Sequence, residues 1–274
     1  MTDFPSASAV EYQDGRLFLF GDDATHLLIL DTNYRSIDKI HYLPDSSFRM
    51  RKNEKADIES AALISTDNGS ELMALGSFSS KNRMSLFQFS LASNSVSVVD
   101  LSFISEKLKA IPELNIEGLA IVGGNIVLAN RANKKHPVNK LVIGNNDLRT
   151  FSPSSIIAMH FRGKNVVGVS GLYYVKERDL LLFTASEENT YSATEDGAIS
   201  DSYLGWIHNF SKKLTDRSIQ PSELISLSSV DKTFTKQKIE SVCVQGINGD
   251  EMLIHLVSDN DDGRSGLFKM RLRF

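Results

Sequence analysis

The stretch KIESVCVQGINGDEMLIHLVSDNDDGRSGLFKMRLRF, residues 238–274, contains three apolar runs separated by turn residues. Glu240 opens the first run, and the pair Asn248-Gly249 separates it from a second run at residues 252–257. Asn-Gly pairs favour two-residue hairpin turns because both residues tolerate a positive φ. An acidic loop at residues 258–263 then leads into a third run at residues 266–272. The stretch therefore predicts an antiparallel three-stranded meander.

The same pattern occurs four more times upstream. The residue that opens each copy lies roughly 51–70 residues after the one before, a period typical of repeat architectures. These five residues, called the openers below, are Ser8, Glu59, Glu117, Ser170 and Glu240. A two-residue hairpin signal follows three of the upstream openers, at Asp14-Gly15, Asn68-Gly69 and Gly123-Gly124, whereas the fourth copy has Lys176-Glu177-Arg178-Asp179.

The first four copies also carry a fourth apolar run, at residues 37–43, 96–101, 156–161 and 223–227. Short runs of β-branched and aromatic residues between turn residues favour strands. A helical spacing occurs at residues 103–111, and Pro112 ends it. Meanders in series predict an all-β fold, a β-propeller with five four-stranded blades. A ring of six blades is the alternative, and a β-sandwich does not explain the long period.

The last copy supplies only three runs before the chain ends at Phe274. The N-terminal residues belong to no copy of their own, and they would complete the final blade as its outer strand beside residues 266–272. We therefore expect one domain, residues 1–274, whose ring is closed by the N-terminal strand.

Composition excludes several classes of protein. The formal net charge is −4 and the pI is about 5.9, which argues against a nucleic-acid or anionic-membrane surface, since both need clustered Lys and Arg. Cys243 is the only cysteine, so there is no internal disulfide framework. The N-terminus lacks a signal-peptide pattern, which predicts a cytoplasmic protein, with an exported domain without its leader as the alternative. We expect a monomer with a small-molecule or protein partner.

Three strings carry a family resemblance: LNIEGLAIVGGNIVLANRAN (114–133), GLYYV with LLLFTASEEN and EDGAISDSYLGWI (171–207), and KIESV with LVSDNDDGRSGLFKMRL (238–272). They resemble an uncharacterised bacterial family of small propellers, which is in turn similar to the phytase-like, or esterase-like, β-propeller domains. The resemblance implies a ring of six or a similar number of blades with bound calcium. It covers nearly the whole chain but carries over no catalytic motif.

The repeat predicts where the functional groups gather. In an antiparallel meander the start of strand one and the end of strand two share one edge. If strand one is innermost, the openers converge at the mouth of the channel with the residues that end strand two: Asp22, Ser77, Arg131, Ser186 and Asp259. Carboxylates so close raise one another's pKa unless a positive charge neutralises them.

Two interpretations of this acidic mouth remain open. In the first, arginines such as Arg131, Arg83 and Arg264 form ion pairs that hold the blades in register. In the second, the carboxylates bind a hard cation such as calcium, with Glu59, Glu240, Asp259 and Asp22 as its ligands. For Glu117 we expect pairing with Arg131, because both belong to one repeat.

The longest loop, residues 186–202, is predicted to fold over or beside the mouth, since long loops in compact domains are usually functional or disordered. Its expected contacts to a ligand are Glu187, Asn189, Tyr191 and Asp196. The full set of predicted ligand-binding residues is Glu59, Glu117, Arg131, Glu187, Asn189 and Glu240. His26 opens a third strand at the mouth and is the best candidate for proton transfer.

Two hypotheses of function follow. The first is a propeller that binds a small ligand or a protein partner at the channel mouth. The second is a metal-assisted hydrolase of an ester, lactone or phosphoester, in which Glu59, Glu117, Glu240 and Asp259 act as ligands or as acid and base. The sequence contains no P-loop, no zinc spacing and no dinucleotide-binding glycine motif.

Overall fold

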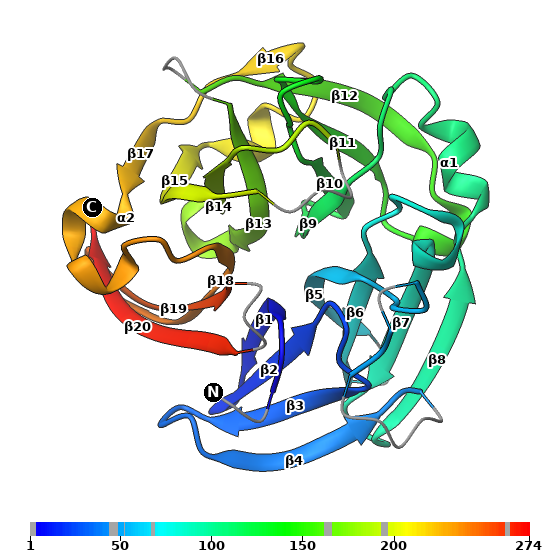
Figure 1. Ribbon diagram of the computed structural model, residues 1–274, viewed down its shortest axis with the longest axis vertical. Helices are drawn as coiled ribbons and strands as arrows, with labels where there is room; N and C mark the ends of the chain where they lie inside the picture. Colours follow the sequence, from blue (N-terminus) through cyan, green and yellow to red (C-terminus); the bar gives the residue numbers. More distant parts are fainter. Residues whose placement is uncertain are drawn as a thin grey trace.

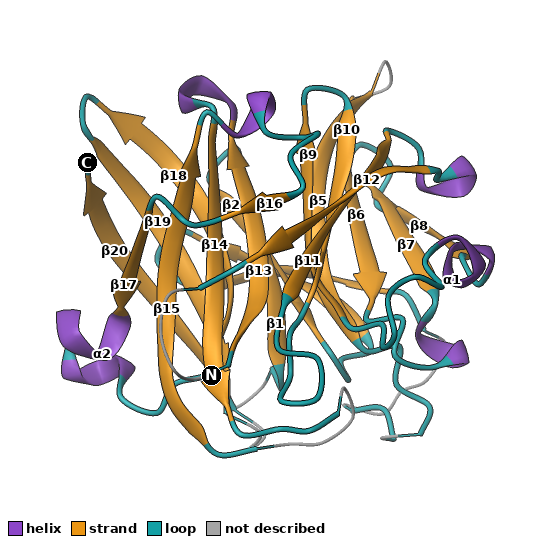
Figure 2. Ribbon diagram, turned by 90° about the horizontal axis from the view of Figure 1, so that it is seen from above, coloured by secondary structure: helices purple, strands orange, loops and turns teal. Residues whose placement is uncertain are grey.

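Five sheets stand around a central channel like the blades of a propeller (Figure 1). The structure, a computed structural model, describes residues 4–43, 49–51, 53–66, 69–161, 166–192, 197–260 and 264–274. The strands run between the two faces of the ring, and the helices lie at its periphery (Figure 2). The predicted all-β propeller with five blades is confirmed.

Each blade is an antiparallel meander whose first strand is innermost. Blade 1 contains β1 (Ala7–Gln13), β2 (Arg16–Gly21), β3 (His26–Asp31) and β4 (Ser36–His41). Blade 2 contains β5 (Ile58–Thr66), β6 (Gly69–Gly76), β7 (Ser85–Ser90) and β8 (Ser95–Asp100). Blade 3 contains β9 (Ile116–Val122), β10 (Asn125–Asn130), β11 (Asn139–Asn145) and β12 (Pro153–Met159), with β16 (Ser218–Ile219) added in parallel to β12.

Blade 4 contains β13 (Val167–Val175), β14 (Leu180–Glu188), β15 (Ile199–His208) and β17 (Glu223–Ser226). Blade 5 contains β18 (Ile239–Asn248), β19 (Glu251–Asp259) and β20 (Ser265–Arg273). The helices are α1 (Phe103–Lys107) and α2 (Leu227–Val230), with short 3-10 turns η1 (Lys81–Arg83), η2 (Leu148–Thr150), η3 (Lys176–Arg178), η4 (Phe210–Lys212) and η5 (Lys232–Phe234). No described helix is long and apolar enough to cross a membrane.

The hydrophobic core lies between the blades. Each of five apolar clusters combines side chains of two neighbouring blades; Leu141 of blade 3, for example, packs in one cluster with Val169 and Phe183 of blade 4. Alternate residues of a strand face opposite sides of its sheet, so each blade supplies side chains to the clusters on both sides. Burial of this apolar surface holds the blades together.

Hydrophobic packing also closes the ring. Phe4 is fully buried in the cluster between blades 5 and 1, together with Cys243 and Val257. The Ser265 hydroxyl, at the start of β20, donates to the Phe4 carbonyl at 2.7 Å and accepts from the Ala7 amide at 2.9 Å. Residues 2–3 of the predicted closing strand lie outside the described residues. Phe4 and Pro5 form no ladder with β20, which pairs with β19 alone among the described strands, so the described part of the predicted closing strand does not form.

Most predicted turns form as the sequence indicates. Asp14 and Gly15 have φ of +49° and +81°, and Gly123 and Gly124 have +56° and +78°, as a two-residue hairpin requires. In blade 5 the turn falls one residue later than predicted, because Asn248 still pairs with Glu251. The predicted helix at residues 103–111 is confirmed only over Phe103–Lys107.

A β-bulge occurs at the opener of every blade. In blade 2, Ile58 pairs with Gly76 and Ser60 pairs with Leu75, so Glu59 is the extra residue between them. The same shift surrounds the other openers: Ser8, Glu117, Ser170 and Glu240. A bulge bends the strand and re-aims the side chain of its extra residue. The five bulges therefore present five equivalent side chains at one end of the channel.

We predict that Ser265→Ala destabilises the ring by about 1–3 kcal/mol, because it leaves the buried Ala7 amide without its acceptor. Urea unfolding measures the loss. Ser36→Ala, at an exposed position of β4, is the matched control and should change the free energy of unfolding by less than about 0.5 kcal/mol. Equal effects of the two substitutions would show that the hydrogen bond between Ser265 and Ala7 does not stabilise the junction of blades 5 and 1.

Candidate functional site

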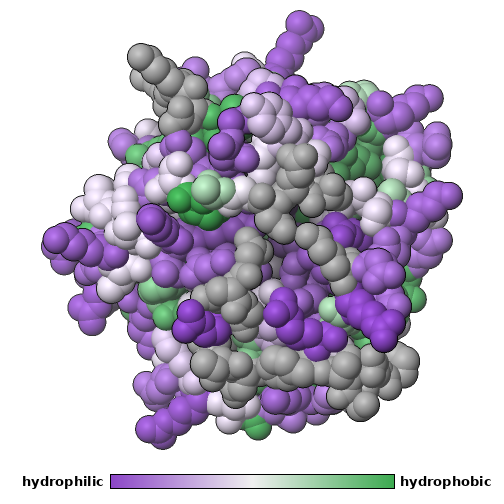
Figure 3. Space-filling model, viewed as in Figure 1, coloured by the Kyte–Doolittle hydropathy of each residue, from purple (hydrophilic) through white to green (hydrophobic). Residues whose placement is uncertain are grey.

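A cavity of about 450 Å³ lies at the mouth of the channel, where the openers gather. Its lining includes eight carboxylates, Asp22, Asp23, Asp57, Glu59, Glu117, Glu188, Glu240 and Asp259. Five cationic side chains also line it, Arg49, Lys55, Arg83, Arg131 and Lys238. Hydrophilic side chains cover most of the face of the ring seen in Figure 3. The predicted convergence of the glutamate openers with Asp22, Arg131 and Asp259 is confirmed, whereas Ser77 and Ser186, predicted to join them, do not line the cavity.

The serine openers and the glutamate openers have different structural roles. The Ser8 hydroxyl donates to the Ile58 carbonyl, just before the opener of blade 2. In the same way the Ser170 hydroxyl donates at 2.6 Å to the Ile239 carbonyl, just before the opener of blade 5. These two openers fasten one blade to the next, whereas the glutamate openers face the cavity.

The position two residues before the opener also contributes to the mouth in four of the blades, and its residues were not among the predicted site residues. Its residues are Ser6, Asp57, Asn115, Gly168 and Lys238; the four that carry a side chain line the cavity. At Gly168 the space is filled by Arg131, whose Cγ would lie 2.6 Å from an added Cβ. The two-residue period of a strand, applied to the openers, would have identified Asp57 and Lys238.

Arg131 ties blade 3 to blade 4. Its Nη1 lies 2.9 Å from Glu117 Oε2, and its Nη2 lies 2.8 Å from Glu188 Oε2 and 2.6 Å from the Ser186 hydroxyl. The guanidinium is almost completely buried, so these charge-assisted bonds are needed to keep it there. The predicted pairing of Glu117 with Arg131 is confirmed.

The carboxyl group of Glu240 is only partly neutralised by its cationic neighbours. Its Oε1 lies 3.1 Å from Lys238 Nζ, but its Oε2 accepts no hydrogen bond from the described residues and lies 3.9 Å from Arg131 Nη1. Lys238 and Arg131 together face three carboxylates, those of Glu240, Glu117 and Glu188. Burial raises the pKa of Glu240 to about 8, with Glu117 and Glu188 adding to the rise and the two cations opposing it. This group therefore holds a proton at neutral pH.

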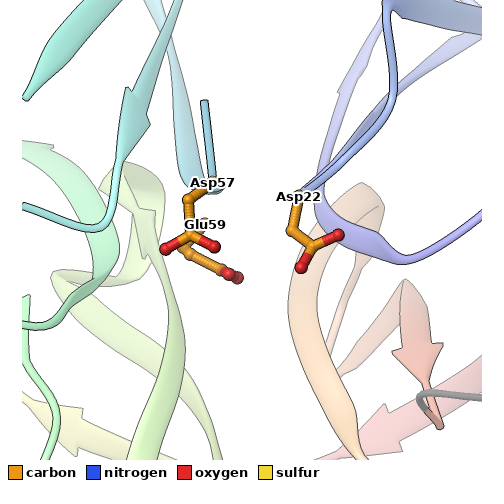
Figure 4. Close-up of side chains that lie close together, drawn as sticks. All are labelled: Asp22, Asp57 and Glu59. Atoms are coloured by element: carbon orange, nitrogen blue, oxygen red, sulfur yellow. The ribbon is translucent and has the colours of Figure 1, made fainter. Parts of the chain in front are cut away.

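Asp22, Asp57 and Glu59 form a second acidic group at the mouth. Their side chains extend toward one another from blades 1 and 2 (Figure 4), and one oxygen of each lies within 4.8 Å of the others. Lys55 forms ion pairs with Asp22 and, at 2.7 Å, with Asp57. Arg83 binds the other oxygen of Asp57 at 2.8 Å. Two of the three carboxylates are thus already neutralised.

Glu59 is the third, and within the described part of the chain its carboxyl group makes no hydrogen bond or ion pair. Burial raises its pKa well above the ordinary value, and the carboxylates of Asp57, Glu117, Asp22 and Glu240 raise it further. Its side chain is half-buried and faces the cavity. Glu59 is therefore a hydrogen-bonding group that the fold leaves available to a ligand.

The four predicted metal ligands do not come together as one set. Asp22 and Glu59 do, and Asp57 joins them in place of Glu240 and Asp259. Glu240 lies beside Lys238 instead. Three carboxylate groups suit a hard cation, but the Lys55 ammonium already pairs with two of them.

The predicted long loop is shorter than expected, because β14 and β15 continue to pair as far as Glu188 and Ile199. Thr190 and Ser192, at its start, line the cavity, whereas Asp196 lies outside the described residues. Glu187 and Asn189 do not line it: Glu187 accepts from the Tyr203 hydroxyl at 3.3 Å, and Asn189 is exposed. Glu188, between them, enters the site, since neighbouring strand residues face opposite sides.

His26 is not part of the mouth. It is buried between the rings of Phe4 and His41, at centroid distances of 5.4 and 5.3 Å. Burial lowers its pKa to about 4, with smaller contributions from Lys39 and His41. His26 is not among the residues that line the cavity, so the structure does not bring it to the site where proton transfer was predicted.

The chain belongs to a protein family of unknown function, DUF6929, whose model matches residues 3–272. No curated protein sequence matches the chain. Among solved structures, it is similar to an arabinanase of Bacillus subtilis, with 14% identity over 98% of this chain and 94% of that one, and a TM-score of 0.52. A glutaminyl cyclase of Myxococcus xanthus has 12% identity, the same coverage and a TM-score of 0.55.

An exo-1,5-α-L-arabinanase from a bovine ruminal metagenomic library shares 11% identity over 100% of this chain and 95% of that one, with a TM-score of 0.51. At such identities the similarity shows the fold alone. The relation to phytase-like propellers stays a prediction, since the comparisons place the chain in a family of unknown function with propeller-fold neighbours.

We predict that Glu240→Gln changes how stability depends on pH. Below about pH 4 the carboxyl group is protonated in the folded and unfolded states alike. As pH rises from there towards 8, the unfolded chain releases the proton while the folded protein keeps it. The free energy of unfolding of the wild type should therefore fall relative to the variant, by up to about 1.4 kcal/mol per pH unit.

Urea unfolding at a series of pH values measures this slope. A constant offset from the lost contact with Lys238 does not alter the slope. Glu106→Gln, at an exposed position of α1, is the control and should follow the wild type. Parallel curves for wild type and Glu240→Gln would mean that Glu240 is ionised throughout.

Proposed function

We propose that the channel mouth binds a small hydrophilic molecule rich in hydroxyl or ammonium donors. The observation that carries the proposal is Glu59, a carboxyl group that faces the cavity and has no partner within the described chain. Only Met50 and Ala132 contribute apolar side chains to the lining. The cavity volume of about 450 Å³ falls within the range of small-molecule sites, although its lining is more polar than usual.

The distribution of charge supports a ligand that donates hydrogen bonds. Carboxylates outnumber cations at the mouth, and the cations Arg131, Lys55 and Arg83 are already held in ion pairs. The acceptors that remain among the described residues include Glu59, the Oε2 atom of Glu240 and the Oδ1 atoms of Asp22 and Asp23. The ion pairs also fix the lining before a ligand arrives, which lowers the entropic cost of binding. Glu117 and Arg131 would act as the rigid wall between these acceptors.

Thermal unfolding with added probes tests the proposal. Neutral sugars and polyols supply hydroxyl donors, and putrescine supplies ammonium donors. We expect at least one class to raise the melting temperature of the wild type, and Glu59→Gln to abolish that rise while remaining folded, because the amide no longer offers two acceptor oxygens. Glu106→Gln is the control and should respond as the wild type does.

Two results would defeat the proposal. One is that neither class of probe changes the melting temperature of the wild type. The other is that Glu59→Gln and wild type respond equally, since the ligand would then bind elsewhere.

The acidic group of Asp22, Asp57 and Glu59 favours a second candidate, a cation-assisted hydrolase of an ester, lactone or phosphoester. A calcium ion held by these oxygens would act as a Lewis acid towards the substrate. Glu240, which holds a proton near neutral pH, has the state that a general acid needs. Asp259 also lines the cavity and remains a predicted contributor to this site.

The Lys55 ammonium competes with a cation for this group, which gives a test of the second candidate. We expect calcium to raise the melting temperature of Lys55→Met by more than that of the wild type, because the variant removes the ammonium group that competes with a cation for Asp22 and Asp57. Adding a chelator should reverse the rise. Lys39→Met, at an exposed position of β4, controls for the loss of one positive charge. If calcium affects neither protein, the site does not hold this cation.

A further inference from the structure

A second cavity, of about 100 Å³, lies among the innermost strands of blades 1 to 4. Its lining shares no residue with the mouth and consists of Glu11, Ala62, Leu63, Leu119, Ala120, Ile121, Tyr173 and Tyr174. These residues follow the openers along β1, β5, β9 and β13, so the cavity lies further along the channel, away from the mouth. Glu11 is the only ionisable side chain of this lining besides the two tyrosines.

The Glu11 carboxyl group is buried without a partner. Its side chain is 4% exposed, and it forms neither a hydrogen bond nor an ion pair with the described residues. Burial alone raises its pKa well above the ordinary value. A buried carboxyl group without a partner costs free energy in either protonation state, and more when it is charged.

Comparison of the repeats shows that the fold itself does not need an acid here. Glu11 lies three residues after its opener, and the same position of the other blades holds Ala62, Ala120, Tyr173 and Cys243. All four are uncharged at neutral pH, and each packs in an apolar cluster between blades. Hydrophobic residues therefore satisfy this position, and the carboxyl group of Glu11 lacks a structural explanation.

We infer that this cavity is a second binding site, which takes a small alkylammonium cation with its charge beside Glu11 and its alkyl group against the apolar wall. A carboxylate next to aromatic rings is the chemistry that recognises such cations, through an ion pair and cation–π contact. Burial raises the pKa of the Tyr173 hydroxyl, and the Glu11 carboxylate raises it further, because the two side chains lie close together. Leu119, Ala120 and Ile121 supply the apolar wall.

Size and access restrict the ligand. A volume of about 100 Å³ corresponds to roughly three water molecules, which admits a cation of only a few non-hydrogen atoms. Tyr173 and Tyr174 also line a groove of about 480 Å³ together with residues of β18. Because these two tyrosines line both spaces, the groove is the approach that the inference assigns to the cation.

Methylammonium chloride is the probe, with sodium chloride at equal concentration as the control for ionic strength. The measurement is made at about pH 8, because the ion pair needs ionised Glu11. We expect a rise of about 2–4 °C in the melting temperature of the wild type when methylammonium is present at roughly five times its Kd. Tetraethylammonium, which exceeds the cavity, should cause no rise.

Two variants test the charge and the volume of the site separately. Glu11→Gln removes the charge but keeps the shape, and Ala120→Val fills the cavity and keeps the charge. Both should lose the response to methylammonium. Glu59→Gln, at the mouth, should keep it, which separates this site from the proposed ligand site. Because the readout is the shift caused by the probe, a change in baseline stability does not affect it.

Three outcomes would overturn the inference. An equal response of the wild type to sodium and methylammonium would reduce the effect to ionic strength. A full response of Glu11→Gln would place the cation elsewhere. Loss of the response in Glu59→Gln but not in Glu11→Gln would assign methylammonium to the mouth. The last result would contradict the second site while supporting the first.

Discussion

The β-bulge at the start of each innermost strand is the constraint on which the mouth depends. It occurs at the same repeat position in all five blades and leaves the opener outside the ladder. A side chain released from the ladder can bind the next blade, as Ser8 and Ser170 do through a backbone carbonyl. It can also face the cavity, as Glu59 and Glu240 do. One irregularity of the backbone thus serves both the assembly of the ring and its chemistry.

Electrostatics at the mouth follow from this geometry, because the ring brings three glutamates to one end of the channel. Arg131 and Lys238 pair with Glu117, Glu188 and Glu240, and Lys55 and Arg83 pair with Asp22 and Asp57. These cations leave several carboxyl oxygens without a partner among the described residues. In low dielectric such a group keeps its proton or meets a ligand. The ion pairs stabilise the ring. The carboxyl groups that they leave without a partner are the groups that a ligand can bind.

Much of this architecture could be predicted from the sequence, because repeat period and turn residues act locally. The five blades and the meeting of Glu59, Glu117 and Glu240 followed from equivalent repeat positions. Pairing register is set by tertiary contacts, which moved the last hairpin turn by one residue and replaced Glu187 with Glu188 in the site. Lys55 was missed for a related reason. It precedes blade 2 in a segment without repeat counterparts, so only the folded ring shows which carboxylates it neutralises.

The seam between blades 5 and 1 has a consequence for the order of folding. Ser265 meets Phe4 and Ala7 across 261 and 258 residues of sequence, whereas each blade is a local meander. Contacts between distant residues carry a large loop-closure entropy, which the chain recovers only after the intervening structure has formed. The blades can therefore form early and in sequence, while the ring closes last. Until then Phe4, Cys243 and Val257 are exposed, and a partly made ring presents an apolar face to its neighbours in the cell.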